Sequence, residues 1–229
     1  MRLLHVISII LLLSYTSASK IEFDRYTIDD GLSQNTVYKV FQDSRGYIWL
    51  GTQGGLDRFN GYEFKHYEHE SNDSTSIVNG WIRAINEDED GLLWLGTVGG
   101  NLGWFDPYDE IGGEIDLFAD HPDFDRPGYI YDILFHGDYI FLTTLGSGLC
   151  RYNRKDGSTL WYSSDSTSKH YIKDRVFTNV YSIDEDKILL GDRSIIILNT
   201  ETNEHVEPYN ELIEKEIGVP FDSIKVSSI

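Results

Sequence analysis

The 229-residue sequence has little cysteine, little positive charge and no long apolar run. Cys150 is the only cysteine, so no disulfide can form within the chain and a folded domain depends on its core alone. The 19 lysine and arginine residues are outnumbered by 38 aspartate and glutamate residues, which gives a formal charge of −19. A chain this acidic repels nucleic acid and anionic membrane surfaces, and we expect neither as a partner of this region.

The longest mostly apolar stretch, residues 3–13, is interrupted only by His5 and Ser8 and is too short to span a bilayer, which takes about 20 residues. It follows the positively charged Arg2 and precedes small residues at 16–18. This pattern is typical of a secretory signal peptide, which we predict at residues 1–19. Residues 20–229 are then expected in the periplasm or outside the cell.

Aromatic and glycine residues, in contrast, are abundant, and they recur with a period of about 46 residues. The segment at 43–55, DSRGYIWLGTQGG, returns at 88–100 as DEDGLLWLGTVGG, and weaker copies lie at 139–153 and 187–199. Two columns of bulky apolar residues keep this register through all four copies: Trp49, Trp94, Phe141 and Leu189, and Phe59, Phe105, Tyr152 and Leu198. Four copies at one period indicate a repeat architecture.

Each copy has the pattern of four short strands. In the first copy, alternating β-formers predict strands at 36–41, 47–52, 56–59 and 62–67, with a two-residue turn at 60–61. Four antiparallel strands per repeat form one blade of a β-propeller. We therefore predict an all-β fold, a truncated β-propeller of about four and a half four-stranded antiparallel blades, with residues 21–26 as a candidate closing strand. The blades are expected at residues 31–70, 75–123, 128–165 and 175–210, with the start of another at 220–229.

Two of the repeats resemble a known family. The phrases GLSQNTV (31–37), QDSRG (42–46), IWLGT (48–52) and GGLDRF (54–59) are similar to the two-component regulator propeller repeat. The second copy matches at 87–91, 93–97 and 99–100, so the resemblance covers residues 21–106. The third and fourth copies lack the tryptophan and match only by register.

The resemblance implies the periplasmic sensor region of a bacterial membrane signalling protein. In such proteins a membrane helix and an output domain follow the propeller, and the output is a histidine kinase, often a hybrid one, or a GGDEF-type diguanylate cyclase. The resemblance further implies a small-molecule ligand such as a saccharide and no cofactor. It implies membrane attachment only through a downstream helix, and a homodimer is one arrangement open to the full-length protein.

Few residues suit catalysis or metal binding. The glycine-rich segment at 46–61 lacks the lysine of a phosphate-binding loop. The acidic segment at 86–91 resembles a calcium loop, but its twelfth position is Thr97 where a bidentate glutamate is needed. His66 and His69 are three residues apart, which places them on opposite faces of a strand. We therefore predict no catalytic and no metal-binding residues. We expect a structural role, in packing between blades and in turns, for Trp49, Gly51, Gly55, Trp94, Gly96 and Gly100.

One face of a propeller is built from the loops that precede the inner strands and the loops that join the second and third strands. In this sequence those loops carry amides and aromatic rings, which suit a sugar through hydrogen bonds and stacking. The predicted ligand-binding residues are Asn35, Gln53, Asn79, Trp81, Tyr129 and Tyr131. In the alternative interpretation, the two asparagines only cap turns and the tryptophan only packs.

Three classes of function are compatible with these residues. The first is an extracytoplasmic sensor module that binds a ligand. The second is a propeller enzyme, a lyase or a glycoside-acting hydrolase, which needs converging histidine, arginine or carboxylate groups at the channel mouth. The third is a protein-interaction scaffold, because a propeller fold does not dictate a function. The predominance of amides and aromatic rings favours the sensor and disfavours an enzyme in this region.

Overall fold

The computed structural model describes residues 22–121, 124–192 and 195–206. Within these ranges the chain forms four four-stranded antiparallel sheets, which confirms the predicted all-β fold with four-stranded blades. The predicted signal peptide at 1–19 and the predicted start of another blade at 220–229 lie outside the described residues. No helix in the described part of the chain is long and apolar enough to cross a bilayer.

Each sheet is a meander of consecutive strands, preceded in the first case by the short 3-10 turn η1 (Ile28–Asp30). The first sheet contains β1 (Val37–Gln42), β2 (Ile48–Thr52), β3 (Leu56–Phe59) and β4 (Phe64–Tyr67). The second contains β5 (Ile82–Glu87), β6 (Leu93–Thr97), β7 (Leu102–Asp106) and β8 (Ile111–Ile115). The third contains β9 (Ile130–His136), β10 (Tyr139–Thr144), β11 (Leu149–Asn153) and β12 (Thr159–Tyr162). The fourth contains β13 (Asn179–Ser182), β14 (Lys187–Gly191), β15 (Ile195–Asn199) and β16 (His205–Val206).

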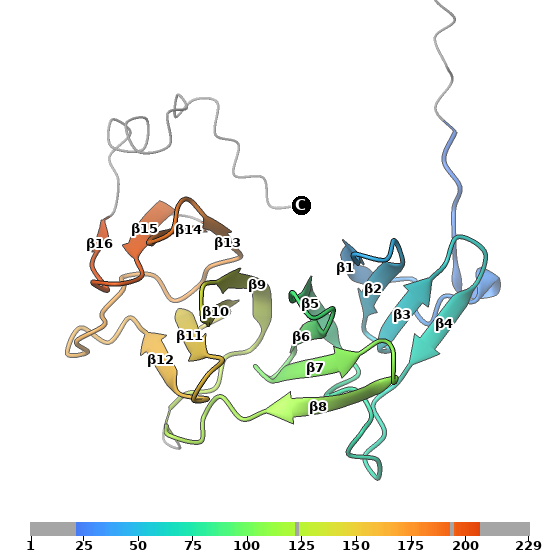
Figure 1. Cartoon of the computed structure of the whole chain (residues 1–229), viewed down its shortest axis with the longest axis horizontal. Helices are drawn as coiled ribbons and strands as arrows, with labels where there is room; N and C mark the ends of the chain where they lie inside the picture. The colour runs from blue at the N-terminus through green and yellow to red at the C-terminus, as the bar shows by residue number, and fades with distance from the viewer. Residues whose placement is uncertain (1–21, 122–123, 193–194, 207–229) are drawn as a thin grey trace, which may run out of the picture.

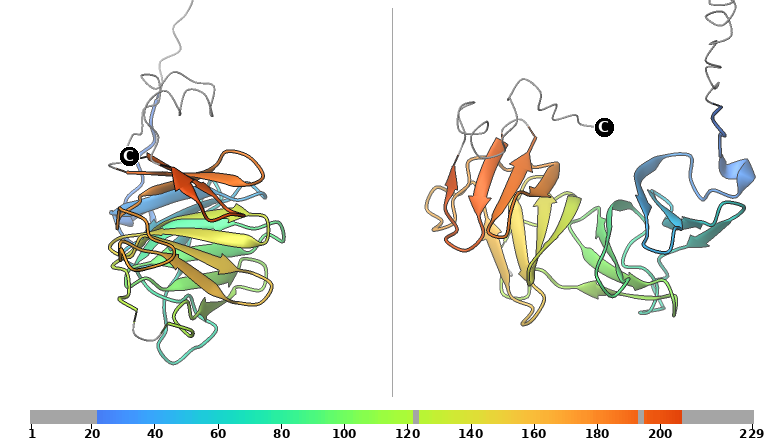
Figure 2. Two further views of the ribbon diagram at one scale, coloured as in Figure 1. Left: turned by 90° about the vertical axis from the view of Figure 1, so that its left-hand side faces the viewer. Right: turned by 45° about the horizontal axis from the view of Figure 1, so that its top comes forward.

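The four sheets are arranged as an arc of propeller blades (Figure 1). Their first strands, β1, β5, β9 and β13, lie on the inner side of the arc, and each contacts the next. Their last strands, β4, β8, β12 and β16, lie at the rim. Figure 2 shows the same order from two other directions. This arrangement brings residues one repeat apart in the sequence side by side around the inner edge.

The core is divided into three apolar clusters, each between two neighbouring sheets. Trp49 of the first sheet packs on Phe105 of the second, with ring centroids 6.0 Å apart, and the Trp49 side chain is fully buried. Trp94 of the second sheet packs likewise on Tyr152 of the third, at 6.3 Å. Phe141 takes this place between the third and fourth sheets. The repeated aromatic column therefore holds adjacent blades together.

In the first two repeats a single carboxylate organises the turn before the tryptophan of the second strand. Asp43 accepts hydrogen bonds from the backbone N–H groups of Arg45 and Tyr47 at 3.0 and 2.8 Å, and from the indole Nε1 of Trp49 at 2.9 Å. The second repeat has the same three bonds, to Asp88 from the N–H groups of Asp90 and Leu92 and from Trp94 Nε1, at 3.1, 3.0 and 2.9 Å. The aspartate thus sets both the hairpin and the position of the packed ring.

Glycine at two equivalent positions allows the next blade to approach closely. A Cβ atom on Gly96 would lie 2.6 Å from Cγ2 of Ile130, and one on Gly51 would lie 3.0 Å from Cγ2 of Ile82. Ile82 and Ile130 are the first residues of the neighbouring inner strands and are fully buried. Any larger side chain would push the blades apart, because the space is already filled.

A polar contact also joins the first two sheets. Glu110, in the loop between β7 and β8, contacts Lys65 Nζ and accepts a hydrogen bond from the Tyr67 hydroxyl at 2.9 Å. Arg58 lies 3.7 Å from the same carboxylate. The hydrogen bond from Lys65 is the main reason that the pKa of Glu110 lies below its usual value.

Two local predictions differ from the structure. The turn after β3 is a four-residue loop and not a two-residue hairpin turn, since Phe59 pairs with Phe64. The Asn60 side chain explains the difference, because its Oδ1 atom accepts the N–H groups of Tyr62 and Glu63, both at 2.9 Å, and closes the wider loop. In the segment expected as a closing strand, the described residues 22–27 form no strand.

Candidate functional site

The loops before the inner strands meet the loops between second and third strands on one face of the arc. Gly99, between β6 and β7, donates its N–H to the carbonyl of Gly128 at 2.8 Å, and Val98 forms a bridge with Tyr129. Leu145 and Val176 form the same bridge one blade further on. Backbone hydrogen bonds therefore join the loops of the second blade to those of the third, and the loops of the third to those of the fourth.

A cluster of aromatic side chains around one arginine lies at the inner edge of this face. We call it the aromatic cluster: Tyr38, Trp81, Arg83, Tyr129 and Tyr131. The Trp81 ring lies 5.8 Å from that of Tyr38 and 6.5 Å from that of Tyr129, and the rings of Tyr129 and Tyr131 are 5.9 Å apart. All five residues are half-buried, and they come from three successive blades.

β-Bulges bring three of these side chains together. The pairing of β1 with β2 shifts between Val37 and Lys39, and Tyr38 is the extra residue. The equivalent shifts leave Arg83 unpaired in β5 and Tyr131 unpaired in β9. A bulge redirects the side chain of its extra residue. The Arg83 guanidinium consequently lies 4.4, 4.9 and 5.4 Å from the ring centroids of Tyr38, Tyr129 and Tyr131.

Three of the six predicted ligand-binding residues belong to the aromatic cluster: Trp81, Tyr129 and Tyr131. Asn79 lies beside it and caps a turn, because its Oδ1 atom accepts the Trp81 N–H at 2.9 Å. Asn35 is exposed and accepts the N–H of Ile28 at 3.1 Å. Gln53 is exposed, and no hydrogen bond or ring contact among the described residues joins it or Asn35 to the cluster.

The prediction from sequence omitted Tyr38 and Arg83. They occupy the same position of the first two repeats, and Tyr131 occupies it in the third. Comparing this position across the repeats could have identified them. The β-bulges that turn these side chains towards one another have no recognisable sequence pattern. Strict alternation along the strand therefore gave no reason to select Tyr38 and Arg83.

A cavity of about 540 Å³ adjoins the aromatic cluster through Tyr131. We call it the inner cavity, since Tyr131 and Thr178 belong to the inner edge of the third and fourth blades. Two basic and two acidic residues take part in its lining, which consists of Tyr131, Leu145, Lys173, Asp174, Arg175, Val176, Thr178 and Asp192. Its size suits a small ligand with several polar groups.

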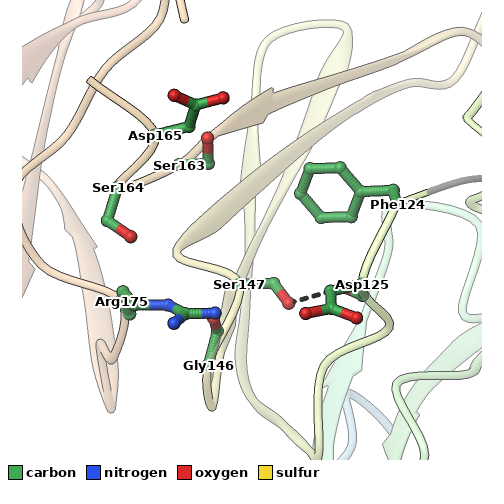
Figure 3. Close-up of a pocket in the computed structure, with 8 residues that line it drawn as sticks. All are labelled: Phe124, Asp125, Gly146, Ser147, Ser163, Ser164, Asp165 and Arg175. Carbon is green, nitrogen blue, oxygen red and sulfur yellow. Dashed lines mark hydrogen bonds between the residues drawn. The ribbon is translucent and has the colours of Figure 1, made fainter. Parts of the chain in front are cut away.

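A second cavity of about 410 Å³, the outer cavity, lies among the segments before β9, after β10 and after β12 (Figure 3). Its lining includes Phe124, Asp125 and a serine pair at the end of the third blade, Ser163 and Ser164. Arg175 lines both cavities, and its Nε atom donates to the carbonyl of Gly146 at 2.9 Å. The two cavities are therefore neighbours on one surface.

Asp165 adds a negative charge to the outer cavity. The backbone N–H of Thr167, and then its hydroxyl, donate to the Asp165 carboxylate and lower its pKa below the usual value. The carboxylate therefore remains ionised at neutral pH and would repel an anion at this end of the surface.

One constellation elsewhere resembles a catalytic triad in composition only. Ser33 donates its hydroxyl to Asp57 at 2.5 Å, and Nδ1 of His66 lies 2.9 Å from the other carboxylate oxygen. Asp57 is fully buried and stands between the two. His66 therefore does not contact the Ser33 hydroxyl as a general base must, and the arrangement ties the loop before β1 to β3 and β4.

The remaining candidate groups have structural contacts. Burial raises the pKa of the Cys150 thiol far above its usual value, which makes it a poor nucleophile. His69 Nδ1 lies 2.8 Å from the carbonyl of Ile77, away from the partners of His66. The carboxylate of Asp88, in the segment that resembles a calcium loop, holds its own turn and Trp94. Among the described residues no group of three histidine, cysteine or carboxylate side chains is placed to hold a metal ion.

Comparison with known proteins relates the repeats to bacterial sensors. Residues 31–54 and 76–99 match the family described as two component regulator propeller. A stretch of 59 residues is 46% identical to the histidine kinase P4 of Formosa agariphila. That stretch is 26% of this chain and 4% of that protein.

Solved structures show the same fold. The extracellular domain described for the hybrid two component system BT3049 from B. thetaiotaomicron superposes with a TM-score of 0.69 and 19% identity, over 81% of this chain and 26% of that one. The extracellular domain described for the one component system BT4673 from the same organism gives 0.60 and 16%, over 84% and 31%. This chain spans less than a third of either structure, and the likeness establishes the fold.

Proposed function

Because the segments at 31–54 and 76–99 are two-component regulator propeller repeats, we propose that this chain is part of an extracytoplasmic sensor of a bacterial membrane signalling protein. The histidine kinase relative and the extracellular domains of similar fold support this proposal. A histidine kinase is the output that the relative favours. We assign the described region a binding role, and place it in the periplasm.

The aromatic cluster beside the inner cavity is the observation that carries the proposal. Rings of Tyr38, Trp81 and Tyr129 offer flat apolar surfaces, and their polar ends and Arg83 offer hydrogen-bond donors. A saccharide presents the complementary surfaces, with apolar ring faces that stack and hydroxyls that accept hydrogen bonds. We therefore propose a small saccharide as the ligand.

The position of the cluster also supplies a means of signalling. Its residues belong to three blades, and the blades contact one another through separate apolar clusters. A ligand that bridges the three inner strands would stabilise one packing of the blades over others. Such a difference in affinity between two packings is sufficient to shift their populations.

Trp81→Ala tests this site in the full-length protein. A library of mono- and oligosaccharides would first be titrated calorimetrically against the wild type to find a ligand. We expect the variant to keep its thermal unfolding midpoint and to bind that ligand about 3–10-fold more weakly, which is the loss of one aromatic stacking contact. Tyr62→Ala removes a ring that is 95% exposed in the β3–β4 loop and serves as the matched control. Equal affinity of Trp81→Ala and wild type would refute the assignment.

A further inference from the structure

The aromatic cluster holds donors that have no acceptors. The Arg83 guanidinium makes ring contacts but no hydrogen bond or ion pair with any residue of the described ranges. The indole N–H of Trp81 is buried and also lacks a partner. Leaving the buried indole N–H unpaired costs free energy, whereas the half-buried Arg83 guanidinium is open to water and lacks only a protein acceptor. The aromatic cluster therefore offers several hydrogen-bond donors that no protein group accepts, and a ligand with acceptor atoms would pair with them.

Other arginines in similar surroundings do have acceptors. Arg58 lies over the rings of Tyr47 and Trp49, and it is 3.7 Å from the carboxylate of Glu110. Arg151, over Tyr139, donates to a carbonyl and a side-chain amide oxygen. Arg45 and Arg154 lie near aspartates, and Arg126, over Phe118, is exposed to water. Among the arginines that contact rings in the described residues, Arg83 alone is both half-buried and without an acceptor.

The acidic residue adjacent to the aromatic cluster in the sequence, Asp132, does not fill this role. Asp132 follows Tyr131, but one of its oxygens pairs with Lys39 Nζ at 3.3 Å. Its other oxygen accepts the N–H of Val180 at 3.2 Å. Asp132 is therefore already engaged within the protein.

We propose that Arg83 binds an anionic group of the ligand, a carboxylate or a sulfate, while the surrounding rings contact the ligand's apolar face. The proposal rests on the proposed sensor function and names the chemical class of its ligand, an acidic saccharide. The tyrosine rings lie over the guanidinium, and its N–H groups form the planar fork that matches an oxyanion. The rings shield part of the half-buried guanidinium from water, which strengthens such hydrogen bonds.

The charges around the site agree with a local anion site in an acidic protein. Lys173 and Arg175 line the inner cavity, which begins at Tyr131. Asp174 and Asp192 balance their charge there, whereas the outer cavity has Asp125 and Asp165 against Arg175 alone, so the less negative end of the surface is next to the cluster. The net charge of −19 slows the approach of an anion from a distance, but affinity is decided by the donors at the site.

The test compares one charged and one neutral sugar on the full-length protein. Thermal unfolding and calorimetry would be followed with sodium D-glucuronate, D-glucose and sodium sulfate, at constant ionic strength set with sodium chloride. We expect glucuronate to bind saturably with a dissociation constant of about 1–10 mM, which is the weak binding expected of a single sugar unit. Glucose is expected to bind at least about 10-fold more weakly, because it has no carboxylate to form a bidentate ion pair with the guanidinium.

Two variants identify the residue responsible. Arg83→Met keeps an unbranched chain between the rings and removes the charge, and it should weaken glucuronate binding about 10–100-fold with little change for glucose. Arg83→Lys keeps the positive charge but lacks the planar pair of N–H donors. Its affinity for glucuronate should lie between those of Arg83→Met and wild type. Arg58→Met removes the ring-stacked arginine that already has Glu110 beside it, and glucuronate binding should be unchanged.

The outcomes separate this inference from the proposed function. Loss of glucuronate binding in Arg83→Met, with a folded protein, supports the anion site. Equal glucuronate binding by Arg83→Met and wild type overturns it, as does the absence of saturable binding by either anion. In both of those cases a neutral saccharide whose binding depends on Trp81 would leave the sensor function standing.

Discussion

At the residue scale, one aspartate in the first hairpin turn of each of the first two blades satisfies three donors at once. In the second blade the side chain of Asp88 is 3% exposed, and Trp94, whose indole it holds, is 7% exposed. Water cannot readily replace a carboxylate in such a place. The donors it serves would be left buried and unpaired if it were removed, which costs more than the net value of the bonds themselves.

We expect Asp88→Ala to lower the free energy of unfolding by about 1–3 kcal/mol. The reason is that Trp94 Nε1 and the Leu92 N–H lose their acceptor. Urea-induced unfolding followed by intrinsic fluorescence measures the change. The matched control is Asp90→Ala, an exposed acidic residue of the same turn, for which the change should be within about 0.5 kcal/mol.

A double variant separates the indole bond from other effects of the substitution. Trp94→Phe removes the indole N–H, so Asp88→Ala should cost less in the Trp94→Phe background than in the wild type. If the two substitutions are additive, the indole–carboxylate bond does not contribute to the stability of the blade.

Part of this motif was predictable from the sequence. An aspartate three residues before a glycine indicates a turn in which the carboxylate accepts backbone N–H groups, and Asp43 and Gly46 satisfy that pattern. The bond to the tryptophan ring was not predictable, because it depends on how the neighbouring blade orients the indole. The sequence pattern describes contacts along the chain, whereas that orientation depends on Phe105 and Tyr152 of the next blades.

At the scale of the elements, the spacing of the blades depends on small residues in their second strands. Gly96 of β6 faces both Ile130 of the next inner strand and Ala84 of its own sheet. A methyl group there would lie 2.6 Å from Ile130 Cγ2 and 2.9 Å from Ala84 Cβ. Neither neighbour can move without disturbing an inner strand, because both side chains are fully buried.

Gly96→Ala should therefore destabilise the protein by about 1–3 kcal/mol, as overpacking of a filled core does. The midpoint of chemical denaturation is the measurement. Gly80→Ala is the matched control, since the nearest atom to its added Cβ atom is the Gln53 carbonyl at 3.9 Å, and its stability should change by less than about 1 kcal/mol. Wild-type stability of Gly96→Ala would show that the blades are spaced more widely than this.

The bounds of the strands were predicted from the sequence to within a few residues, but the lengths of the turns between them were not. The strand predicted at 62–67 begins at Phe64, because the Asn60 side chain closes a four-residue loop. The same limit applies to the inner strands, where alternation predicts which side chains share a face. A bulge reverses that alternation at one residue, and it brought Tyr38 and Arg83 into the site.

At the scale of the whole molecule, the inner edge of the arc connects blades that are not neighbours. The Nζ atom of Lys39 in the first sheet lies 3.3 Å from Asp132 in the third, although the second sheet lies between them in the order of the arc. Asp132 also accepts the N–H of Val180 in the fourth sheet. The distance between Lys39 and Asp132 therefore depends on the curvature of three consecutive blades.

A double-mutant cycle with Lys39→Met and Asp132→Asn measures this connection. The asparagine keeps an acceptor for Val180, so the cycle reports the ion pair. Because the side chains are 33% and 19% exposed, we expect a coupling free energy of about 0.5–1 kcal/mol that decreases at high salt. The control pair, Lys155 and Asp138, lies within one blade and is far more exposed, and it should show no measurable coupling.

The same cycle can report whether ligand binding changes the packing of the blades. If a ligand at the aromatic cluster draws the three inner strands into one arrangement, the coupling between Lys39 and Asp132 should differ between the free and the saturated protein. The coupling of the control pair should stay constant. An identical coupling with and without ligand would mean that the arc is already rigid in the free protein, and that a signal leaves the site by a route other than blade packing.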